Sequence, residues 1–415
     1  MVVDASEGIA DPSVERDLVS VIIPCWNAET TIERAVGSVL VDHGVPLEVV
    51  VIDDGSTDAT GRAVETIQRR DDRVRLVRSP ANEGVSEARN RGLDAARGAW
   101  LAFLDADDRY FGGGLLAMWA AALERDALAV VGQRVWSDGR RTWISRFYDI
   151  PDIRTPGRKS LARHPGLLYY ASTTGKLFHR SCVAGLRFHG RVLGDQPWTI
   201  RALLRAGDRI EVIADDVYEW TRTAPGGASH SITRDTRSVF GLEPVAIATE
   251  ALAAVRAEAA DVVADPAARE LIGATYVGRL LRSDLGVHLA NAIRRRDPMT
   301  GELLAAIGRF LATVEPAALA ATDALAEDIL EPPLRAWDAF PASARPAYWQ
   351  LLGEAAERDP RLPSRARRRA TRLALWVAIH LPHSVGRPLA SLVLEGRRIV
   401  SLARRITGRP RSRRG

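Results

Sequence analysis

The sequence predicts an α/β fold with a mostly parallel sheet, followed by an α-helical C-terminal region. Short apolar segments rich in β-branched residues alternate with segments of helical periodicity between residues 18 and 104. From residue 241 to 360 the chain is rich in Ala and Leu at helical spacing. Polar clusters follow three of the predicted strands, and ligands of parallel sheets bind beyond the carboxyl ends of the strands. A shared site at that edge of the sheet is therefore expected.

The first strand is predicted over 18–23, where a run of aliphatic residues stops at Pro24. A helix is predicted over 30–41, because Ile32, Val36 and Val39 recur at helical spacing. Three further strands are predicted over 47–52, 74–77 and 100–104. A second helix is predicted to be capped by Ser56 or Thr57 and to run to Arg70. The last two helices are predicted over 85–96, where Gly98 stops the helix, and over 196–204.

Composition limits the class of protein. With 415 residues, of which 46% are hydrophobic, the chain is long enough for two or three globular domains. Its two cysteines, Cys25 and Cys182, exclude a disulfide scaffold and suit a reducing compartment. The polar residues 1–17 show no signal-peptide pattern, and no apolar stretch reaches the length of a membrane span. We therefore expect a cytoplasmic protein with a flexible N-terminus over 1–17.

Basic residues are concentrated at the C-terminus. Residues 361–415 hold fifteen Arg and one acidic residue, a net charge of +14, which leaves −9 on the first 360 residues. Arginines precede the apolar stretch 373–379, and Arg397, Arg398, Arg404 and Arg405 lie within the stretch 389–406. This pattern suits helices lying on an anionic membrane surface. A packed helix with a disordered Arg tail, or a nucleic-acid-binding segment, is the alternative, but Trp376 is the segment's only aromatic residue. We predict a basic amphipathic segment over 361–415 that binds the inner face of the plasma membrane and no nucleic acid.

The strand predicted over 100–104 ends in three carboxylates within four residues, Asp105, Asp107 and Asp108. Unpaired carboxylates beside a core are costly, because they repel one another and lose hydration. A divalent cation removes that cost, and Asp oxygens are ligands that Mg²⁺ or Mn²⁺ prefers together with substrate phosphates. The cluster therefore predicts a metal that holds a phosphorylated substrate. The alternative is a solvated loop that caps the next helix.

Two further clusters follow the first and second strands, at 24–29 and 53–56. Neither a Gly-rich dinucleotide-binding loop nor a P-loop follows the first strand, so the loop that would cradle phosphates in those proteins is missing. The phosphates are therefore expected to meet a metal, while a carboxylate reads the base or the ribose.

Four motifs resemble, in order and spacing, the signatures of family 2 glycosyltransferases with the GT-A fold. They are VSVIIPCWN from Val19, VIDDGSTD from Val51, NEGVSEARN from Asn82 and LDADD from Leu104. The resemblance continues more loosely to about residue 233, through GKLF from Gly175, GDQPW from Gly194 and SIT from Ser231, where it is similar to wall teichoic acid and capsule transferases. It implies a GT-A domain over 18–240, and 241–360 is expected to be a helical accessory domain.

The resemblance implies transfer of a sugar from a UDP-sugar donor to an acceptor hydroxyl, usually with inversion. Pro24, Trp26, Asn27 and Glu29 would line the nucleotide pocket, and Asp54 would accept the imide N–H of uracil.

Asn82 and Arg89 would approach the ribose or the diphosphate, and Asp105 and Ala106 would also contact the donor. Two alternatives stay open for these motifs. Asp53 and Asp54 could cap the following helix, and Arg89 could be a solvated helix residue.

By the same resemblance, Asp105 and Asp107 match the DXD motif of the family. Asp107 would bind Mn²⁺ or Mg²⁺ directly, and Asp105 would contact the ribose or reach the metal through water. The metal would act as a Lewis acid on the diphosphate leaving group. Asp108 is expected to cap or support the loop, and His230 could complete the metal shell.

Asp195 matches the Asp of the family's Glu-Asp-Gln signature and would be the general base, unless it only caps its helix. Gly194 stands where the family usually has Glu, which puts a contact to the sugar or the acceptor in doubt. Tyr218, Trp220 and Arg222 alternate on one face of a strand, where they could stack on a sugar or cover the core; we expect core for Tyr218.

The predicted function is metal-dependent transfer from a UDP-sugar to a bacterial envelope glycan or a lipid-linked acceptor, by an enzyme that could be a homo-oligomer. A sugar nucleotidyltransferase is an alternative, but it needs a basic Gly-rich loop where residues 24–29 stand. A non-catalytic glycan-binding or scaffold protein of the same fold is the other alternative. The presence of Asp105, Asp107 and Asp195 argues against it.

Overall fold

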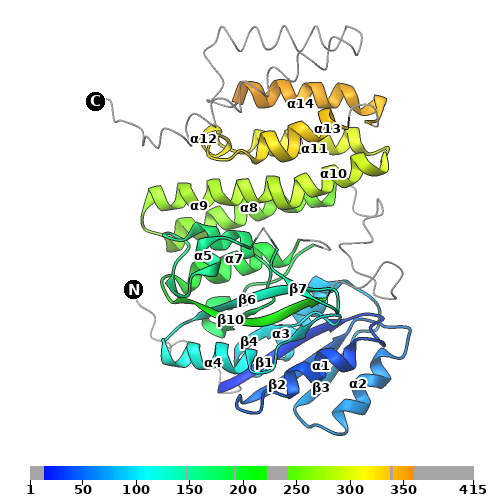
Figure 1. The fold of residues 1–415 in the computed structure, drawn as a ribbon, viewed down its shortest axis with the longest axis vertical. Helices are drawn as coiled ribbons and strands as arrows, with labels where there is room; N and C mark the ends of the chain where they lie inside the picture. Colours follow the sequence, from blue (N-terminus) through cyan, green and yellow to red (C-terminus); the bar gives the residue numbers. More distant parts are fainter. Residues whose placement is uncertain (1–13, 146–147, 191–192, 222–241, 337–339, 359–415) are drawn as a thin grey trace. The chain divides into compact units, whose positions relative to one another are not determined.

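The computed structural model describes residues 14–145, 148–190, 193–221, 242–336 and 340–358. The chain divides into two compact units (Figure 1). The first comprises residues up to Asp235 together with Ala254–Ile272, and the second comprises Thr236–Ala253 and the residues from Gly273 on.

The first unit is built on one sheet whose strands run in the order β3-β2-β1-β4-β9-β6-β10-β5. Four of them are parallel neighbours: β1 (Glu15–Cys25), β2 (Leu47–Asp53), β3 (Val74–Arg78) and β4 (Gly98–Phe103). The other strands are β5 (Arg109–Tyr110), β6 (Ala129–Ser137), β7 (Thr142–Trp143), β8 (Gly157–Lys159), β9 (Lys176–His179) and β10 (Ile210–Thr221). The predicted mostly parallel sheet is confirmed.

One strand, β9, runs antiparallel to its two neighbours in the sheet. β9 is antiparallel to both β4 and β6, while β10 is parallel to β6. As a result β6 and β10 run in the same direction as β4, and the first residue of β9, Lys176, lies toward the edge where those strands end.

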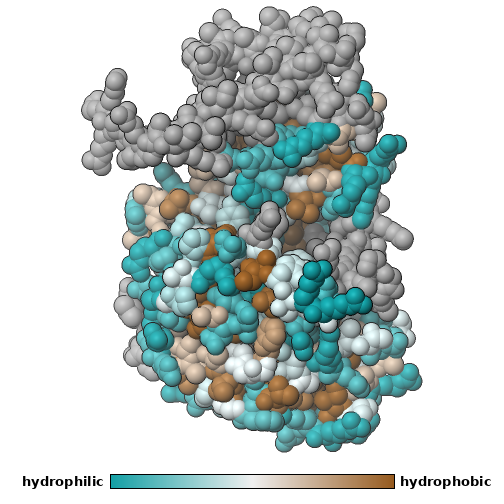
Figure 2. All heavy atoms as spheres, in the orientation of Figure 1, coloured by the Kyte–Doolittle hydropathy of each residue, from teal (hydrophilic) through white to brown (hydrophobic). Residues whose placement is uncertain are grey.

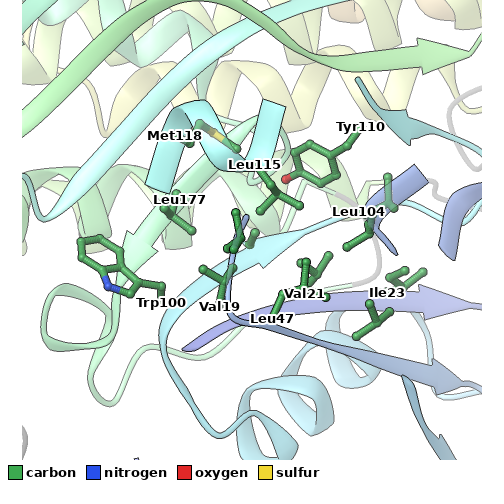
Figure 3. Packing of buried hydrophobic residues seen from close by; sticks show 14 of the residues in the cluster. Val19, Val21, Ile23, Leu47, Trp100, Leu104, Tyr110, Leu115, Met118 and Leu177 are labelled. Atoms are coloured by element: carbon green, nitrogen blue, oxygen red, sulfur yellow. The ribbon is translucent and has the colours of Figure 1, made fainter. Parts of the chain in front are cut away.

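Helices connect the strands of this unit and cover both faces of the sheet, which explains the continuous apolar strands. They are α1 (Ile32–Leu40), α2 (Thr60–Gln68), α3 (Val85–Ala95), α4 (Gly114–Glu124), α5 (Pro151–Arg154), η1 (Pro165–Tyr170), α6 (Arg180–Val183) and α7 (Asp195–Ala206). Figure 3 shows Leu115 and Met118 of α4 facing Val19 and Val21 of β1. On the other face, Gly92 of α3 packs so closely on Ile22 that an added Cβ would lie 2.3 Å from its Cγ2.

The expected elements are present, with differences at their ends. β1 begins at Glu15, three residues early, because the Glu15 N–H extends the pairing by bonding to the Arg97 carbonyl. The prediction that Ser56 or Thr57 caps the second helix is wrong. That helix, α2, begins at Thr60, whose N–H donates to Asp58, while the Ser56 hydroxyl accepts from Asn27.

Gly98 also differs from its prediction as a helix stop. The helix ends at Ala95, and Gly98 is the first residue of β4. An added Cβ at this position would lie 2.4 Å from the Leu18 carbonyl oxygen of β1, so the pairing of these two strands requires glycine here.

A buried carboxylate ties the amino ends of the central strands together. Glu48 of β2 is 1% exposed and accepts hydrogen bonds from the Ser20 hydroxyl at 2.6 Å and from the Arg97 N–H at 2.7 Å. Its other oxygen accepts from Arg75 at 2.8 Å and from the Arg97 side chain at 3.1 Å. Burial works in the opposite direction, but these hydrogen bonds hold the pKa of Glu48 below its ordinary value.

The described residues after 241 are helical, as the sequence predicts. The helices are α8 (Glu243–Val262), α9 (Pro266–Arg279), α10 (Gly286–Arg295), α11 (Thr300–Ala312), α12 (Pro316–Ala320), α13 (Glu331–Arg335) and α14 (Arg345–Arg358), with the π-helical turns Leu280–Leu285 and Leu325–Leu330 and the 3-10 turn Ala342–Ala344. One apolar face of α11 is buried throughout, and it consists of Leu303, Leu304, Ile307, Phe310 and Leu311. Glu258 of α8 belongs to the first unit, where it bonds to Arg201 and Arg205 of α7.

On the face seen in Figure 2, hydrophobic residues of the described chain form separate small groups among hydrophilic ones. None of the helices within the described ranges is both long and apolar enough to cross a membrane. The basic segment 361–415 lies outside the described residues, as do Arg222, His230, Ser231 and Thr233.

Candidate active site

The predicted site residues gather at one edge of the sheet. Because β1, β2 and β4 are parallel neighbours, the loops that follow them leave the sheet on the same side. These loops carry the residues after Pro24, the residues after Asp53, and residues 105–108. Pro24 itself is buried in β1, opposite Ile52 of β2.

Side chains of the first loop are bonded to the second. The Asn27 N–H donates to the Ser56 hydroxyl at 2.9 Å, and the Asn27 Oδ1 accepts from the Thr57 N–H at 2.9 Å. The Glu29 carboxylate accepts from the Ala59 N–H at 2.9 Å. Asn27 and Glu29 therefore hold two loops together, and Trp26 is the large apolar residue that this edge exposes, at 43%.

Asp53 and Asp54 are both nearly inaccessible to solvent. The Asp53 carboxylate accepts from the Ser56 N–H at 3.0 Å, and the Asp54 carboxylate accepts from the Gly84 N–H at 2.8 Å and from the Glu83 N–H. The alternative that they cap the helix after their own strand is therefore wrong. Gly55 closes the turn at φ +70°, where an added Cβ would lie 2.5 Å from the Ala81 carbonyl carbon.

The contacts of Asp54 fix the segment that leads into α3. Glu83 and Gly84 directly precede that helix, so their N–H groups belong to its N-terminal end, where a carboxylate is stabilised. Asn82, the residue before them, is exposed. Recognition of uracil by Asp54 stays a prediction.

Arg89 is a buried cation of α3. It is 7% exposed, and its Nη2 donates to Asp105 Oδ1 at 2.9 Å. Its guanidinium carbon lies 5.6 Å from the centre of the Phe188 ring, and its Nε has no hydrogen-bond partner within the described part of the chain. The alternative of a solvated helix residue is therefore wrong for Arg89.

The loop of residues 105–108, which we call the DXD loop, is fixed by four hydrogen bonds with Tyr218, Thr221 and Arg34. The Asp105 N–H donates to the Tyr218 hydroxyl at 3.2 Å, and that hydroxyl donates to Asp108 Oδ2 at 2.7 Å. The Thr221 N–H donates to Asp108 Oδ1 at 2.7 Å, and the Arg34 guanidinium of α1 donates to the Asp107 carbonyl.

The carboxylates of this loop differ in environment. Asp108 is fully buried, and burial together with the nearby carboxylates of Asp107 and Asp105 raises its pKa well above the ordinary value. Asp108 thus supports the loop, as expected, and Tyr218 is a core residue, as expected. Asp105 and Asp107 are half-buried and Ala106 lies between them.

The donor set at this loop suits a divalent ion that keeps part of its shell for a substrate. Within the described ranges, no group of three or more Asp, Glu, His or Cys side chains is arranged to enclose a metal. The two carboxylates of Asp105 and Asp107 fit the coordination preference of Mg²⁺. This ion usually binds one or two protein carboxylates and completes its coordination shell with water and phosphate oxygens.

Asp195 is the first residue of α7, and the capping position before it is Gly194, which makes no side-chain cap bond. The alternative that Asp195 is only the helix cap is therefore wrong. An added Cβ at Gly194 would lie 2.2 Å from the His189 carbonyl oxygen and 2.7 Å from the Ser86 hydroxyl. A glutamate, which the family usually has here, does not fit this backbone.

Aromatic packing holds α7 against the rest of the site. The Trp198 ring stacks on Phe188 with centres 4.7 Å apart and meets Phe103 of β4 edge-on at 5.3 Å. Phe188 is the ring beneath Arg89, and its backbone exchanges two hydrogen bonds with the Asn90 side chain of α3. Arg89 therefore contacts the DXD loop on one side and the support of α7 on the other.

Sequence reasoning missed some of the residues that build this edge. Arg34 reaches the DXD loop from α1, but an Arg on an amphipathic helix gives no signal of that contact. Arg134 and Lys176, which both contact the Tyr170 ring, were also missed as neighbours, because 42 residues separate them in the sequence.

The family profile described as Glycosyl transferase family 2 matches residues 20–187. Among curated proteins, the chain is 36% identical over 209 residues to the uncharacterized glycosyltransferase EpsJ of Bacillus subtilis, which covers 48% of this chain and 60% of that protein. It is 40% identical over 95 residues to the putative teichuronic acid biosynthesis glycosyltransferase TuaG of the same organism. That alignment covers 23% of this chain and 38% of TuaG. The chain thus spans less than two thirds of the length of these relatives.

Among solved structures, the chain is similar to residues 1–349 of TarS of S. aureus in complex with UDP-GlcNAc. The TM-score is 0.62 at 21% sequence identity, and the match covers 82% of this chain and 91% of that one. This likeness confirms the predicted fold.

Proposed function

We propose, from the match of residues 20–187 to the glycosyl transferase family 2 profile, that this chain is an inverting, metal-dependent glycosyltransferase. Its donor is a UDP-sugar, and its acceptor is a hydroxyl of a bacterial envelope glycan or of a lipid-linked precursor. EpsJ and TuaG, which bear glycosyltransferase names, and the UDP-GlcNAc complex of TarS support this proposal.

One observation carries the proposal. Arg89 contacts both Asp105 of the DXD loop and Phe188, the ring on which Trp198 of α7 packs. Asp105 of the proposed metal site and α7, the helix that begins at the proposed general base Asp195, are thus connected through one buried cation. Transfer of a sugar with inversion needs this pairing of a leaving-group site with a base, because the acceptor attacks from the side opposite the leaving diphosphate.

Each residue has a stated role in the proposed reaction. Trp26 offers an exposed ring on which the base can stack. Asp107 and Asp105 hold Mn²⁺ or Mg²⁺, which when bound stabilises negative charge on the departing diphosphate as a Lewis acid. Arg89 orients Asp105. Asp195 accepts the proton of the acceptor hydroxyl as that hydroxyl attacks the sugar.

Titration of UDP by calorimetry, with Mg²⁺ or with a chelator, tests the metal role. We expect UDP to bind wild type much more tightly with metal, and we expect this difference to vanish in Asp107→Ala, because Asp107 is the direct ligand. Asp72→Ala is the matched control, since Asp72 is an exposed carboxylate at the opposite edge of the sheet. Equal UDP affinity with metal and with chelator in wild type contradicts the role of Asp107.

A panel of UDP-sugars, assayed for metal-dependent hydrolysis, then identifies the donor without knowledge of the acceptor. Hydrolysis of one member that Asp107→Ala abolishes is the expected result. Release of pyrophosphate from a sugar phosphate and UTP would instead favour a sugar nucleotidyltransferase. Binding of glycans with no hydrolysis of any UDP-sugar would favour a non-catalytic protein of this fold.

We also propose that the basic segment 361–415 places the enzyme at the cytoplasmic face of an anionic membrane. The net charge of +14 supports this, and each arginine near the surface adds roughly 1 kcal/mol of attraction. The full chain is expected to sediment with vesicles containing anionic lipid at low salt, and less so as salt rises. A chain that ends at Pro360 is expected to remain in the supernatant and to keep donor hydrolysis.

The control for the shortened chain is its circular dichroism and unfolding midpoint, which should match those of the full chain. Indifference of the full chain to anionic vesicles at low salt contradicts the membrane role. Unfolding of the shortened chain would show that the segment belongs to a core.

A further inference from the structure

We propose that Trp136, Trp143 and Trp220 form a surface on which a sugar ring of the acceptor stacks. These three side chains, which we call the Trp row, come from β6, β7 and β10. The inference rests on the proposed function only in assigning the sugar to the acceptor. The ligand it recognises is a pyranose ring, which presents C–H bonds on its faces and hydroxyl groups around its rim.

The pairing of three neighbouring strands builds the Trp row. Trp136 of β6 is the register partner of Trp220 of β10 on one side and of Trp143 of β7 on the other. Directly opposed residues of paired strands project to the same face of a sheet, so the three side chains share one face. The ring contacts agree with this register. The Trp136 ring stacks with that of Trp143, with centres 6.4 Å apart, and it meets the Trp220 ring edge-on.

The turn between β6 and β7 holds Trp143 in this row. The Asp138 Oδ1 accepts hydrogen bonds from the N–H groups of Arg140 and Arg141, each at 3.0 Å. Gly139 adopts a φ of +81°, a conformation that favours glycine. Trp143 therefore belongs to a tight hairpin, and this hairpin keeps its ring beside that of Trp136.

The Trp row is partly open to solvent. All three tryptophans are half-buried, and Ile144, the residue after Trp143, is 36% exposed. Trp220 packs against the hydrophobic core and still keeps part of its surface accessible. The faces of aromatic rings carry negative partial charge, so the C–H bonds of a sugar ring are attracted to them. Thr142, the residue before Trp143, is exposed and offers a hydroxyl to the polar rim of such a ring.

The Trp row is joined to the DXD loop. It stands at the carboxyl ends of β6 and β10, which run in the same direction as β4. Thr221, the residue after Trp220, donates its N–H to Asp108 Oδ1 at 2.7 Å. The Thr221 hydroxyl accepts from the Arg34 guanidinium, which also donates to the Asp107 carbonyl. A sugar stacked on this row would therefore lie next to the loop proposed to hold the metal.

The strand order assigns this sugar to the acceptor. In the sheet, β4 lies between the β1–β2 pair on one side and the β6–β10 pair on the other. The proposed nucleotide loops follow β1 and β2, whereas the Trp row stands at the ends of β6 and β10. Because the acceptor attacks from the side opposite the leaving diphosphate, a sugar-binding surface across β4 from the nucleotide loops is placed for the acceptor.

Fluorine NMR of the full-length protein labelled with fluorotryptophan tests the proposal. The chain has ten tryptophans, and replacement by Phe assigns their signals one by one. The probes are methyl β-glucopyranoside and methyl N-acetyl-β-glucosaminide, added first alone and then with Mg²⁺ and saturating UDP. We expect at least one glycoside to shift the signals of Trp143 and Trp220 in both arms. Glycerol, which has hydroxyl groups but no ring, should shift neither signal.

Two replacements of Trp143 separate stacking from a structural role. Trp143→Ala is expected to weaken glycoside binding by roughly 10-fold, read from the Trp220 signal, because one aromatic face is lost. Trp143→Tyr keeps an aromatic face and should bind within a few-fold of wild type. Trp119→Ala is the matched control, since Trp119 is also half-buried but lies on α4. Its glycoside affinity should equal that of wild type.

Three outcomes overturn the proposal: no shift of the Trp143 and Trp220 signals with either glycoside, loss of the shift when UDP is added, or equal glycoside affinity in wild type and Trp143→Ala. Shifts that appear only with protein concentration or with anionic vesicles would instead assign the row to a second copy or to a membrane. The wild-type titration decides the matter even where a variant does not fold. The Trp26 signal reports on the proposed function separately, because UDP should shift it whatever the glycosides do.

Discussion

Replacement of Asp195 by Asn is expected to slow sugar transfer by roughly 10²- to 10⁴-fold while leaving UDP-sugar affinity within a few-fold of wild type. Asn has nearly the same shape as Asp, so the start of α7 and its packing through Trp198 are preserved. What is lost is the capacity to accept a proton from the acceptor hydroxyl. Transfer to an acceptor and donor affinity, measured separately, give the two halves of this result.

The control for Asp195→Asn is Asp208→Asn, which removes an exposed carboxylate just beyond the other end of the same helix. Its transfer rate should equal that of wild type. A transfer rate in Asp195→Asn close to that of wild type would remove Asp195 from the mechanism and leave the base to be found elsewhere.

Replacement of Glu48 by Ala is expected to lower the free energy of unfolding by about 2–6 kcal/mol, because two buried donors each lose their acceptor at a cost of about 1–3 kcal/mol. The Ser20 hydroxyl and the Arg97 N–H lose their acceptor at the junction of β1, β2 and β4. Denaturant unfolding of both proteins measures the difference. Glu65→Ala is the control, because Glu65 and Arg78 form a pair on the surface, where such pairs contribute about 1 kcal/mol or less.

The same carboxylate predicts the sign of a pH effect. Since the folded protein holds the pKa of Glu48 below its ordinary value, the contribution of Glu48 to stability is present above the unfolded pKa and is lost as pH falls through the folded pKa. The difference in unfolding free energy between wild type and Glu48→Ala should therefore shrink with falling pH below about 4.3, the ordinary glutamate value. A difference that stays constant down to the acid transition would contradict this account.

Local patterns in the sequence were sufficient to predict the strands of the parallel half of the sheet. Aliphatic runs such as 47–52 are buried on both faces in the structure, and their chain order follows the alternation of strand and helix. The first and last residues of the helices and strands were harder to predict, because they depend on tertiary contacts. Ser56 looks like a helix cap in the sequence, but its hydroxyl is taken by Asn27 of another loop.

Contacts between distant segments account for most of what the sequence did not reveal. The reversal of β9 has no local signal, because a run such as Leu177-Phe178 is equally compatible with either direction. Glu48 is a single charged residue between Leu47 and Val49, and the sequence does not indicate that it is buried. Its burial is understandable only from the structure, where Ser20 and Arg97 donate hydrogen bonds to it. The role of Tyr218 likewise depends on Asp108, which lies 110 residues earlier in the chain.

The fixed DXD loop has a thermodynamic consequence. Tyr218, Thr221 and Arg34 hold this loop through hydrogen bonds that the protein itself supplies. A loop that is ordered beforehand has little conformational entropy left to lose, so the interaction energy of the donor with this loop is retained as affinity instead of being consumed by ordering. The loop therefore acts as a preorganised template, and the entropy that donor binding costs must arise in other parts of the complex.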